Sequence, residues 1–157
     1  MSYPKFALPS HKIHTCLWFD NNNGLEAATF YTSLFKNSRI TSVAETLVTF
    51  TLDGQDISAL NGGPHYKQTP AASLFIICED QDEIDHFWNA FTADGGKEIQ
   101  CGWVTDKFGV SWQVVPRVLM EMMGDPDEEK AKRAHDAMLN SVKFDIAELK
   151  EAFEGKE

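Results

Sequence analysis

The sequence predicts an α+β protein built from two tandem βαβββ modules and a helical C-terminal extension. The main observation is an internal repeat, because the order strand, helix, three strands occurs twice, over about residues 10–62 and 72–116. The second observation is that the two helical patterns fall at matching places in the halves. The third is that the pattern after about residue 117 is helical to the end.

In the first module, the short segment 12–20 (KIHTCLWFD) is rich in aromatic and β-branched residues and ends at the turn-forming DNNNG. Apolar residues at helical spacing then predict a helix over 25–35. Three strands are expected to complete the module, at 39–45, 47–54 and 56–62. The DGQD stretch predicts a tight hairpin between the last two strands.

The second module begins after the Gly- and Pro-rich connector GGPHYKQTP. A strand at 72–80 precedes a helix at 81–93, for which Asp80 is the expected N-cap and Glu83 completes a capping box. The remaining strands of this module are predicted at 97–101, 103–106 and 110–116. In the extension, acidic residues at the expected helix starts predict further helices at 125–139 and 145–153.

The composition limits the classes of function. A chain of 157 residues suits one domain, or two small halves that share a core. The 24 acidic residues outnumber the 14 basic ones, and the net charge of −10 argues against binding of a nucleic-acid backbone. Because no apolar run of about 18 residues and no secretory leader occurs, no membrane association is expected, and we expect a soluble cytoplasmic protein.

The three cysteines, Cys16, Cys78 and Cys101, all lie in apolar, strand-like segments without paired spacing. This pattern predicts buried reduced thiols rather than a disulfide framework or a CxxC motif. None of them has an evident histidine partner in the sequence, so no nucleophilic site is expected.

Gln113 raises a more informative question, because it lies in a strand that otherwise looks like core. Strict alternation sends Gln113 to one face and Trp112 to the other, so Trp112 is expected to pack beneath a helix. A buried amide needs hydrogen-bond partners. Two interpretations remain open: Gln113 faces a ligand cavity, or it is a structural residue that bridges strand ends.

Four phrases of the sequence support a resemblance to a known family: WFDNN…EAATFYTSLF, ALNGGP, CEDQDEIDHFW and CGWVTDKFGVSWQVVP. They resemble the PhnB-like (3-demethylubiquinone-9 3-methyltransferase-like) branch of the vicinal oxygen chelate superfamily, which has the glyoxalase/bleomycin resistance/dioxygenase fold. The resemblance covers about residues 12–153. It implies a single domain over residues 1–157, with a small-molecule cavity between the two modules.

In metal-using relatives, the cavity holds a divalent ion on four strand positions. The matching positions of this sequence are His14, Ser58, Ser73 and Gln113. Only the imidazole is a strong ligand, since hydroxyl groups bind divalent ions poorly without neighbouring carboxylates. We therefore expect no tightly bound metal and no other cofactor, with His14 serving as a hydrogen-bonding group of the cavity wall.

The candidate residues for contact with a small-molecule ligand combine these four positions with nearby aromatic and polar residues. They are His14, Trp18, Ser58, Asn61, Ser73, Trp103, Phe108 and Gln113. Apolar walls with a few convergent polar groups are typical of a small-molecule site. The alternative for each aromatic residue is a place in the core.

Methyltransferase activity is not expected, despite the name of the resembling family. A methyltransferase that uses a nucleotide-type cofactor normally carries a Gly-rich turn after the first strand of a doubly wound sheet, and this sequence has none. Two hypotheses for the function remain. The chain is a small-molecule-binding protein or enzyme, or it is a non-catalytic dimeric binding or regulatory module.

A homodimer is expected under either hypothesis, because the extension has more apolar residues than one small core needs. Those residues are Leu119, Met122, Met123, Met138, Leu139, Phe144, Ile146, Leu149 and Phe153. The sequence also allows the alternative that the extension folds back on its own chain.

Overall fold

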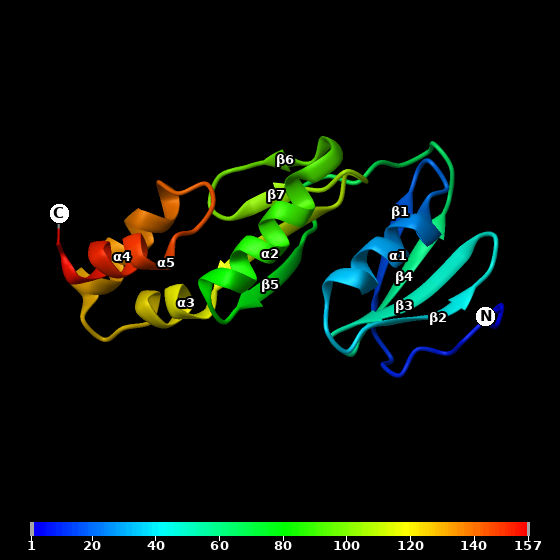
Figure 1. Ribbon diagram of the computed structural model, residues 1–157, viewed down its shortest axis with the longest axis horizontal. Helices are drawn as coiled ribbons and strands as arrows, with labels where there is room; N and C mark the ends of the chain where they lie inside the picture. Colours follow the sequence, from blue (N-terminus) through cyan, green and yellow to red (C-terminus); the bar gives the residue numbers. More distant parts are fainter. Residues whose placement is uncertain (1, 157) are drawn as a thin grey trace. The chain divides into compact units, whose positions relative to one another are not determined.

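The computed structural model describes residues 2–156, which form two compact units that divide between Gln68 and Thr69. Unit 1 comprises the residues up to Gln68, and unit 2 comprises those from Thr69 onward. Each unit contains one four-stranded mixed sheet and a helix that covers one face of it (Figure 1). The α+β class with two βαβββ modules and a helical extension is therefore confirmed.

Unit 1 has its elements in the predicted order. They are β1 (Thr15–Phe19), α1 (Gly24–Leu34), β2 (Arg39–Val43), β3 (Leu47–Leu52) and β4 (Gln55–Asn61). The sheet has the strand order β1-β4-β3-β2, in which β1 is parallel to β4 and the other pairs are antiparallel. The predicted hairpin is present, because Leu52 pairs with Gln55 across a two-residue turn whose residues both have positive φ.

Helix α1 packs on one face of this sheet because small residues let it approach closely. Ala27, Ala28 and Tyr31 are fully buried, and the Tyr31 ring lies 6.2 Å from the ring of Phe50 on β3. Strand alternation places Leu17 and Phe19 of β1 and Ile57 of β4 on this same face. The opposite face of the sheet, which we call the distal face, is consequently lined by a different set of residues.

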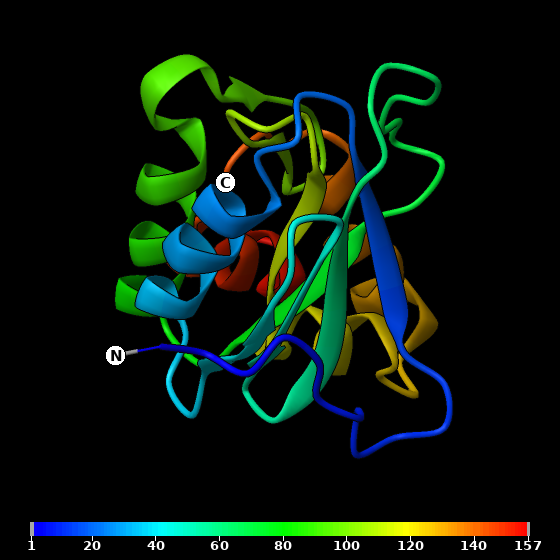
Figure 2. The same cartoon turned by 90° about the vertical axis from the view of Figure 1, so that its right-hand side faces the viewer.

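The segment before β1 is an extended arm, not a longer first strand as the prediction for 12–20 assumed (Figure 2). Its backbone is held at the edge of the sheet, where Val43 N donates to Pro4 O at 2.8 Å. It is held again at His11, whose backbone N and Nδ1 both donate to the carboxylate of Asp56, at 2.9 and 2.8 Å.

Unit 2 repeats the architecture. Its elements are β5 (Leu74–Cys78), α2 (Gln81–Thr92), a 3₁₀ turn η1 (Ala93–Gly95), β6 (Lys97–Glu98), β7 (Trp103–Thr105) and β8 (Ser111–Pro116). The strand order β5-β8-β7-β6 and the parallel β5–β8 pair match unit 1. The expected strand 97–101 ends early, because Cys101 has a φ of 60° and its amide donates to Ser141 O instead of to a strand.

Helix α2 begins at the predicted cap. Asp80 accepts a hydrogen bond from Glu83 N at 2.9 Å, and the Glu83 carboxylate accepts one from Glu79 N at 2.7 Å. The buried side of α2 then meets β8, where Phe91 stacks on Trp112 with ring centroids 4.5 Å apart. The sequence-based expectation that Trp112 packs beneath a helix is confirmed.

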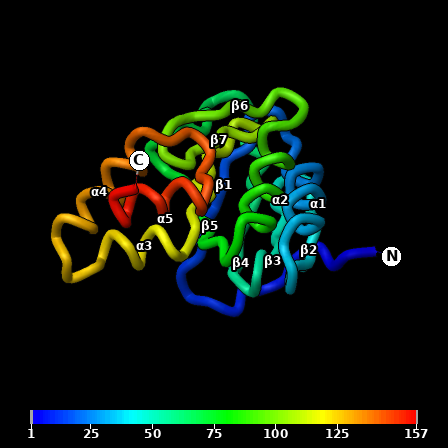
Figure 3. The backbone as a smooth tube through the Cα atoms, turned by 60° about the vertical axis from the view of Figure 1, so that its left-hand side comes forward, coloured from blue at the N-terminus to red at the C-terminus, as the bar shows by residue number. Residues whose placement is uncertain are grey.

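The extension forms three helices, not two: α3 (Arg117–Met123), α4 (Glu128–Leu139) and α5 (Ile146–Glu154). Helix α4 starts three residues later than predicted, because Asp127 is its N-cap and accepts from Glu129 N and Lys130 N. The three helices lie together within unit 2 (Figure 3). Among residues 2–156, no helix is both long enough and apolar enough to cross a membrane.

The extension packs against its own unit. The Gln81 side chain accepts from Ile146 N and donates to Phe144 O, and Cys101 N and Gly102 N donate to Ser141 O and Val142 O. Several apolar residues that were expected at a dimer interface are buried within the single chain. They are Leu119, Met122, Phe144 and Leu149. These four residues therefore belong to the core of unit 2, whereas Met123 and Leu139 of the same set are exposed, and the homodimer stays a prediction.

We expect Gly102→Ala to unfold unit 2 far more easily than Gly109→Ala. Both glycines have positive φ, 77° and 86°, so both substitutions carry the left-handed penalty of about 1–2 kcal/mol. A Cβ at Gly102 would also lie 2.3 Å from the Phe144 ring and 2.9 Å from Val114 O, whereas nothing lies within 4 Å of one at Gly109. In urea unfolding, Gly102→Ala should lower the free energy of unfolding by about 1–3 kcal/mol more than Gly109→Ala does. Equal losses for the two variants would mean that Phe144 does not pack on the Gly102 turn.

Candidate functional site

The distal face of unit 1 carries a row of small polar side chains. Register pairs Cys16 with Ser58, Ser58 with Thr49, and Thr49 with Ser42, so these four residues follow one another across all four strands. The Thr49 hydroxyl shares hydrogen bonds of 2.6 Å with both Ser42 and Thr41. Ser58 in turn bonds to His14, which precedes β1.

His14 Nε2 and Ser58 Oγ share a hydrogen bond of 2.9 Å. In unit 2, Gln113 Nε2 donates to Ser73 Oγ at the same distance of 2.9 Å. The two pairs occupy equivalent positions in their sheets. Ser58 pairs in register with Cys16, and His14 lies two residues before Cys16. In the same way, Gln113 pairs with Phe75, and Ser73 lies two residues before Phe75. The structure thus brings the four predicted positions together as two hydrogen-bonded pairs, one in each unit.

The direction of Gln113 is set by a buried carboxylate on the preceding turn. Asp106 accepts from Phe108 N, Val110 N and Trp112 Nε1, at 2.8, 3.1 and 2.8 Å. These bonds hold the indole of Trp112 on the side of α2, and alternation then turns Gln113 to the distal face. Asp106 was not among the predicted site residues, although an acidic residue directly before a Gly-containing turn is a signal that the sequence carries.

Trp103 and Phe75 flank Gln113 on the distal face, since both pair with it in register, from β7 and β5 respectively. The sequence predicted Trp103 but missed Phe75, although Phe75 lies two residues after Ser73 and therefore shares its face. Phe75 and Ile77 are exposed apolar residues of this face, with 48% and 40% of their surface accessible.

Trp18 lies on the distal face of β1, but a connector covers its ring. Its Nε1 donates to Gly63 O at 2.9 Å, Gly62 lies against the indole, and Tyr66 meets it edge-on at 4.9 Å. Trp18 is thus the anchor of the loop that leaves β4. Its ring is already occupied by contacts within unit 1.

Asn61 and Phe108 are not on the distal faces with the other candidates. Asn61 Oδ1 accepts from Gly24 N and its Nδ2 donates to Glu45 O, both at 2.9 Å, so the side chain ties α1 to its sheet. Phe108 lies in the β7–β8 turn, beneath the Lys107 ammonium, at 5.4 Å from the ring centroid. Asn61 therefore serves the fold of unit 1, and the ligand contact predicted for Phe108 stays a prediction.

Asp56 and Ser111 are a second equivalent pair with contrasting surroundings. Asp56 lies two residues before Ser58, and Ser111 lies two residues before Gln113. Asp56 is bonded by His11, and this hydrogen bond holds the pKa of the carboxyl below its ordinary value. Ser111 Oγ is buried and has no hydrogen-bond partner among residues 2–156. An unsatisfied buried hydroxyl is uncommon and costly.

The donor set does not suit a tightly held divalent ion. Unit 1 offers one imidazole beside a hydroxyl, and unit 2 offers an amide beside a hydroxyl. Zinc, manganese and similar ions require several imidazole, thiolate or carboxylate ligands. Within the described part of the chain, no three His, Cys, Asp or Glu residues are grouped so that they could hold a metal.

The prediction of buried thiols is right for Cys78 and wrong for the other two cysteines, because Cys16 is exposed and Cys101 is half-buried. Cys16 and Cys78 are weak nucleophiles. Partial burial raises the pKa of the Cys16 thiol, and burial together with the carboxylates of Glu83, Asp80 and Glu79 raises the pKa of Cys78 to about 12. Both thiols are therefore protonated near neutral pH, and a protonated thiol does not attack.

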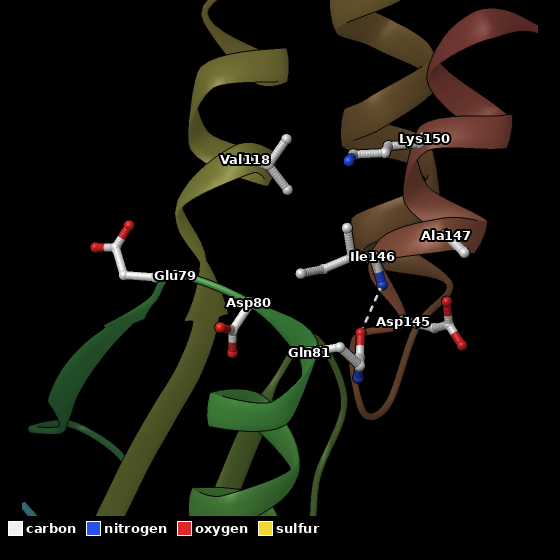
Figure 4. Close-up of a pocket in the computed structure, with 8 residues that line it drawn as sticks. All are labelled: Glu79, Asp80, Gln81, Val118, Asp145, Ile146, Ala147 and Lys150. Atoms are coloured by element: carbon white, nitrogen blue, oxygen red, sulfur yellow. Dashed lines mark hydrogen bonds between the residues drawn. The ribbon is translucent and has the colours of Figure 1, made fainter.

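A separate depression of about 550 Å³ lies in unit 2, where β5 leads into α2 beside α3 and α5 (Figure 4). Its lining residues are Glu79, Asp80, Gln81, Val118, Asp145, Ile146, Ala147 and Lys150. Most of its polar groups already serve the fold: Asp80 and Asp145 cap α2 and α5, and Glu79 pairs with Arg117. None of the predicted site residues lines it.

Comparison with known structures identifies the fold. A protein of Pseudomonas aeruginosa (PA1353) is 21% identical over 68% of this chain and 98% of its own, with a TM-score of 0.55. A glyoxalase-related enzyme from Fulvimarina pelagi is 12% identical over 69% of this chain and 91% of its own, with a TM-score of 0.50. The chain therefore has the glyoxalase fold of the vicinal oxygen chelate superfamily.

Within that superfamily, the family is also established. The family model described as 3-demethylubiquinone-9 3-methyltransferase matches residues 11–115. The PhnB protein from Bacillus cereus is 34% identical over 68% of this chain and 99% of its own, with a TM-score of 0.63. The chain belongs to this PhnB-like family, as the sequence phrases predicted. A comparison with curated proteins finds no match.

We expect the His11–Asp56 contact to stabilise unit 1 only above the acid range. The folded pKa of Asp56 lies below its ordinary value of 3.8, so the stabilisation is present above that value and is lost as the pH falls through the folded pKa. At pH 7, His11→Ala should lower the free energy of unfolding by about 1 kcal/mol, because His11 is half exposed.

The measurement is urea unfolding of both proteins at neutral pH and at a series of pH values below 3.8, over which the difference should shrink as the Asp56 carboxyl becomes protonated. His65→Ala is the control, since His65 is exposed and outside this contact. A difference that persists unchanged in acid would show that Asp56 is not the partner responsible.

Proposed function

We propose that this PhnB-like protein binds a small organic molecule on the distal faces of its two sheets, without a tightly held metal ion. The observation that carries the proposal is the equivalence of His14–Ser58 and Ser73–Gln113. The same strand positions, repeated in two modules, hold side chains in fixed hydrogen-bonded orientations on the faces that the helices leave free. Fixed polar groups on an apolar wall orient a ligand at little entropic cost.

Unused hydrogen-bonding capacity supports this proposal. Gln113 Oε1 accepts no hydrogen bond from the described residues, and Gln113 Nε2 uses one of its two hydrogens on Ser73. Ser111 Oγ, two residues earlier on the same face, also lacks a partner within residues 2–156. Gln113 is half-buried, so its free groups are available to a ligand, whereas the Ser111 hydroxyl is fully buried. The raised pKa values of Cys16 and Cys78 favour binding over nucleophilic chemistry.

The proposal predicts that Gln113→Leu and His14→Leu each weaken ligand binding. Saturation-transfer NMR with a library of uncharged fragments should find binders to the wild type. Each binder that contacts the changed side chain should lose about tenfold in affinity, the value of roughly one hydrogen bond. Asn89→Ala, on the exposed side of α2, should leave every affinity unchanged. If fragments bind all four proteins equally, or none binds, the distal faces are not the binding site.

A homodimer is a second proposal, and exposed apolar residues of the N-terminal arm support it. Phe6, Leu8 and Ile13 have 74%, 98% and 85% of their surface accessible, although the backbone on either side of Phe6 and Leu8 is held at Pro4 and His11. Large apolar side chains on a tethered segment favour burial against another protein surface. A second copy of the chain is the partner we propose.

Sedimentation equilibrium at micromolar concentration tests the dimer. We expect a mass of twice the 17.7 kDa chain for the wild type, and a shift toward the monomer when Phe6 and Leu8 are both changed to Ser. A wild-type mass of one chain would contradict the proposal.

A further inference from the structure

The side chains around Gln113 on the distal face of unit 2 limit the class of ligand that this face can bind. Phe75, Gln113 and Trp103 lie in one row across three neighbouring strands, β5, β8 and β7. The remaining distal positions of these strands hold Ile77, Val115, Ser111 and Thr105. None of these side chains carries a charge, in a protein whose net charge is −10.

The spacing of the row suits one flat ring. Side chains stand roughly perpendicular to a sheet, and neighbouring strands lie about 4.8 Å apart. Phe75 and Trp103 lie on the strands either side of Gln113, so their side chains leave the sheet about 9.6 Å apart. A ring held over Gln113 would have its centre about 4.8 Å from each aromatic neighbour. Aromatic pairs prefer centroid separations of about 4.5–7 Å.

The amide between the two rings supplies the polar recognition. Gln113 Nε2 donates to Ser73 Oγ, and this bond fixes the plane of the amide. Its Oε1 remains an acceptor and its second N–H remains a donor, on adjacent atoms. A cyclic amide presents the complementary pattern, a donor beside an acceptor. An ionised ligand would lose its hydration over β5, β8 and β7 without meeting an opposite charge, because the cation of this face, Lys97, lies on β6 at the edge of the sheet, beyond Thr105.

We infer that the distal face of unit 2 binds an uncharged, planar aromatic ring that carries an amide-like donor–acceptor edge, between Phe75 and Trp103 and against Gln113. This inference rests on the proposed function and names the class of its ligand. Stacking supplies the affinity, and the glutamine amide supplies the orientation.

Three probes of similar size test the inference: carbostyril, quinaldate and octahydrocarbostyril. The first is the flat cyclic amide, the second is a flat anion, and the third is the saturated amide. In NMR titrations of the ¹⁵N-labelled protein, carbostyril should shift the Gln113 side-chain amide and the Trp103 indole signals. It should bind about tenfold more tightly than either of the other probes, as expected for loss of stacking or burial of an unpaired charge.

Variants separate the two contacts. Phe75→Leu should weaken carbostyril binding about tenfold and leave octahydrocarbostyril unaffected, because only the flat ring stacks. Gln113→Leu should weaken both amides. Phe30→Leu, an equal change on helix α1 of unit 1, is the control and should change neither affinity.

The outcomes that overturn the inference differ from those that overturn the proposed function. If quinaldate or octahydrocarbostyril binds as tightly as carbostyril and shifts the same signals, the ligand class is wrong while binding at the distal face stands. If no probe shifts the Gln113 or Trp103 signals, the inference is overturned, and the fragment screen decides the proposed function by itself.

Discussion

The carboxylate of Asp106 accepts three hydrogen bonds within unit 2, and the direction of every side chain on β8 depends on them. Two of the donors are backbone amides of the β7–β8 turn, and the third is the indole of Trp112. A one-residue slip of β8 would exchange its two faces. Because the indole is bonded to Asp106 and stacked on Phe91, that slip would break a charge-assisted bond and an aromatic contact together. The position of Gln113 on the distal face is therefore a consequence of how Trp112 is held.

The two units use one architecture with different chemistry on their distal faces. Unit 1 fills its central row with hydroxyl groups that satisfy one another, and His11 covers the carboxylate of Asp56. Unit 2 places aromatic rings beside Gln113. Its residue equivalent to Asp56 is Ser111, whose hydroxyl has no hydrogen-bond partner in the described structure. A repeated fold fixes the geometry of a site but not its side chains. In this chain, unit 2 retains the larger unused capacity for contact with a ligand.

Local patterns in the sequence predicted most of the fold and part of the site. Alternation placed Trp112 and Gln113 on opposite faces, and the Asp80 cap was visible from its spacing to Glu83, because both depend on neighbours within a few residues. Asn61 was assigned to the site, yet its amide bonds to Gly24, 37 residues away, which no local pattern encodes. Phe75 was missed for a related reason, since its place beside Gln113 follows from strand register.

The helical extension illustrates how a segment outside the family match completes the core. The match ends at residue 115, but Phe144 fills the space that Gly102 leaves by lacking a Cβ, and the Gln81 amide joins α2 to the chain on either side of Asp145. Part of the apolar surface that looked like a surplus in the sequence is thus used inside unit 2. Leu119 and Leu149 are each about 1% exposed, so neither has surface to offer a partner. Association between copies of this chain cannot use these buried leucines, and the most exposed large apolar side chains among the described residues, Leu8, Ile13 and Phe6, lie on the arm that precedes β1.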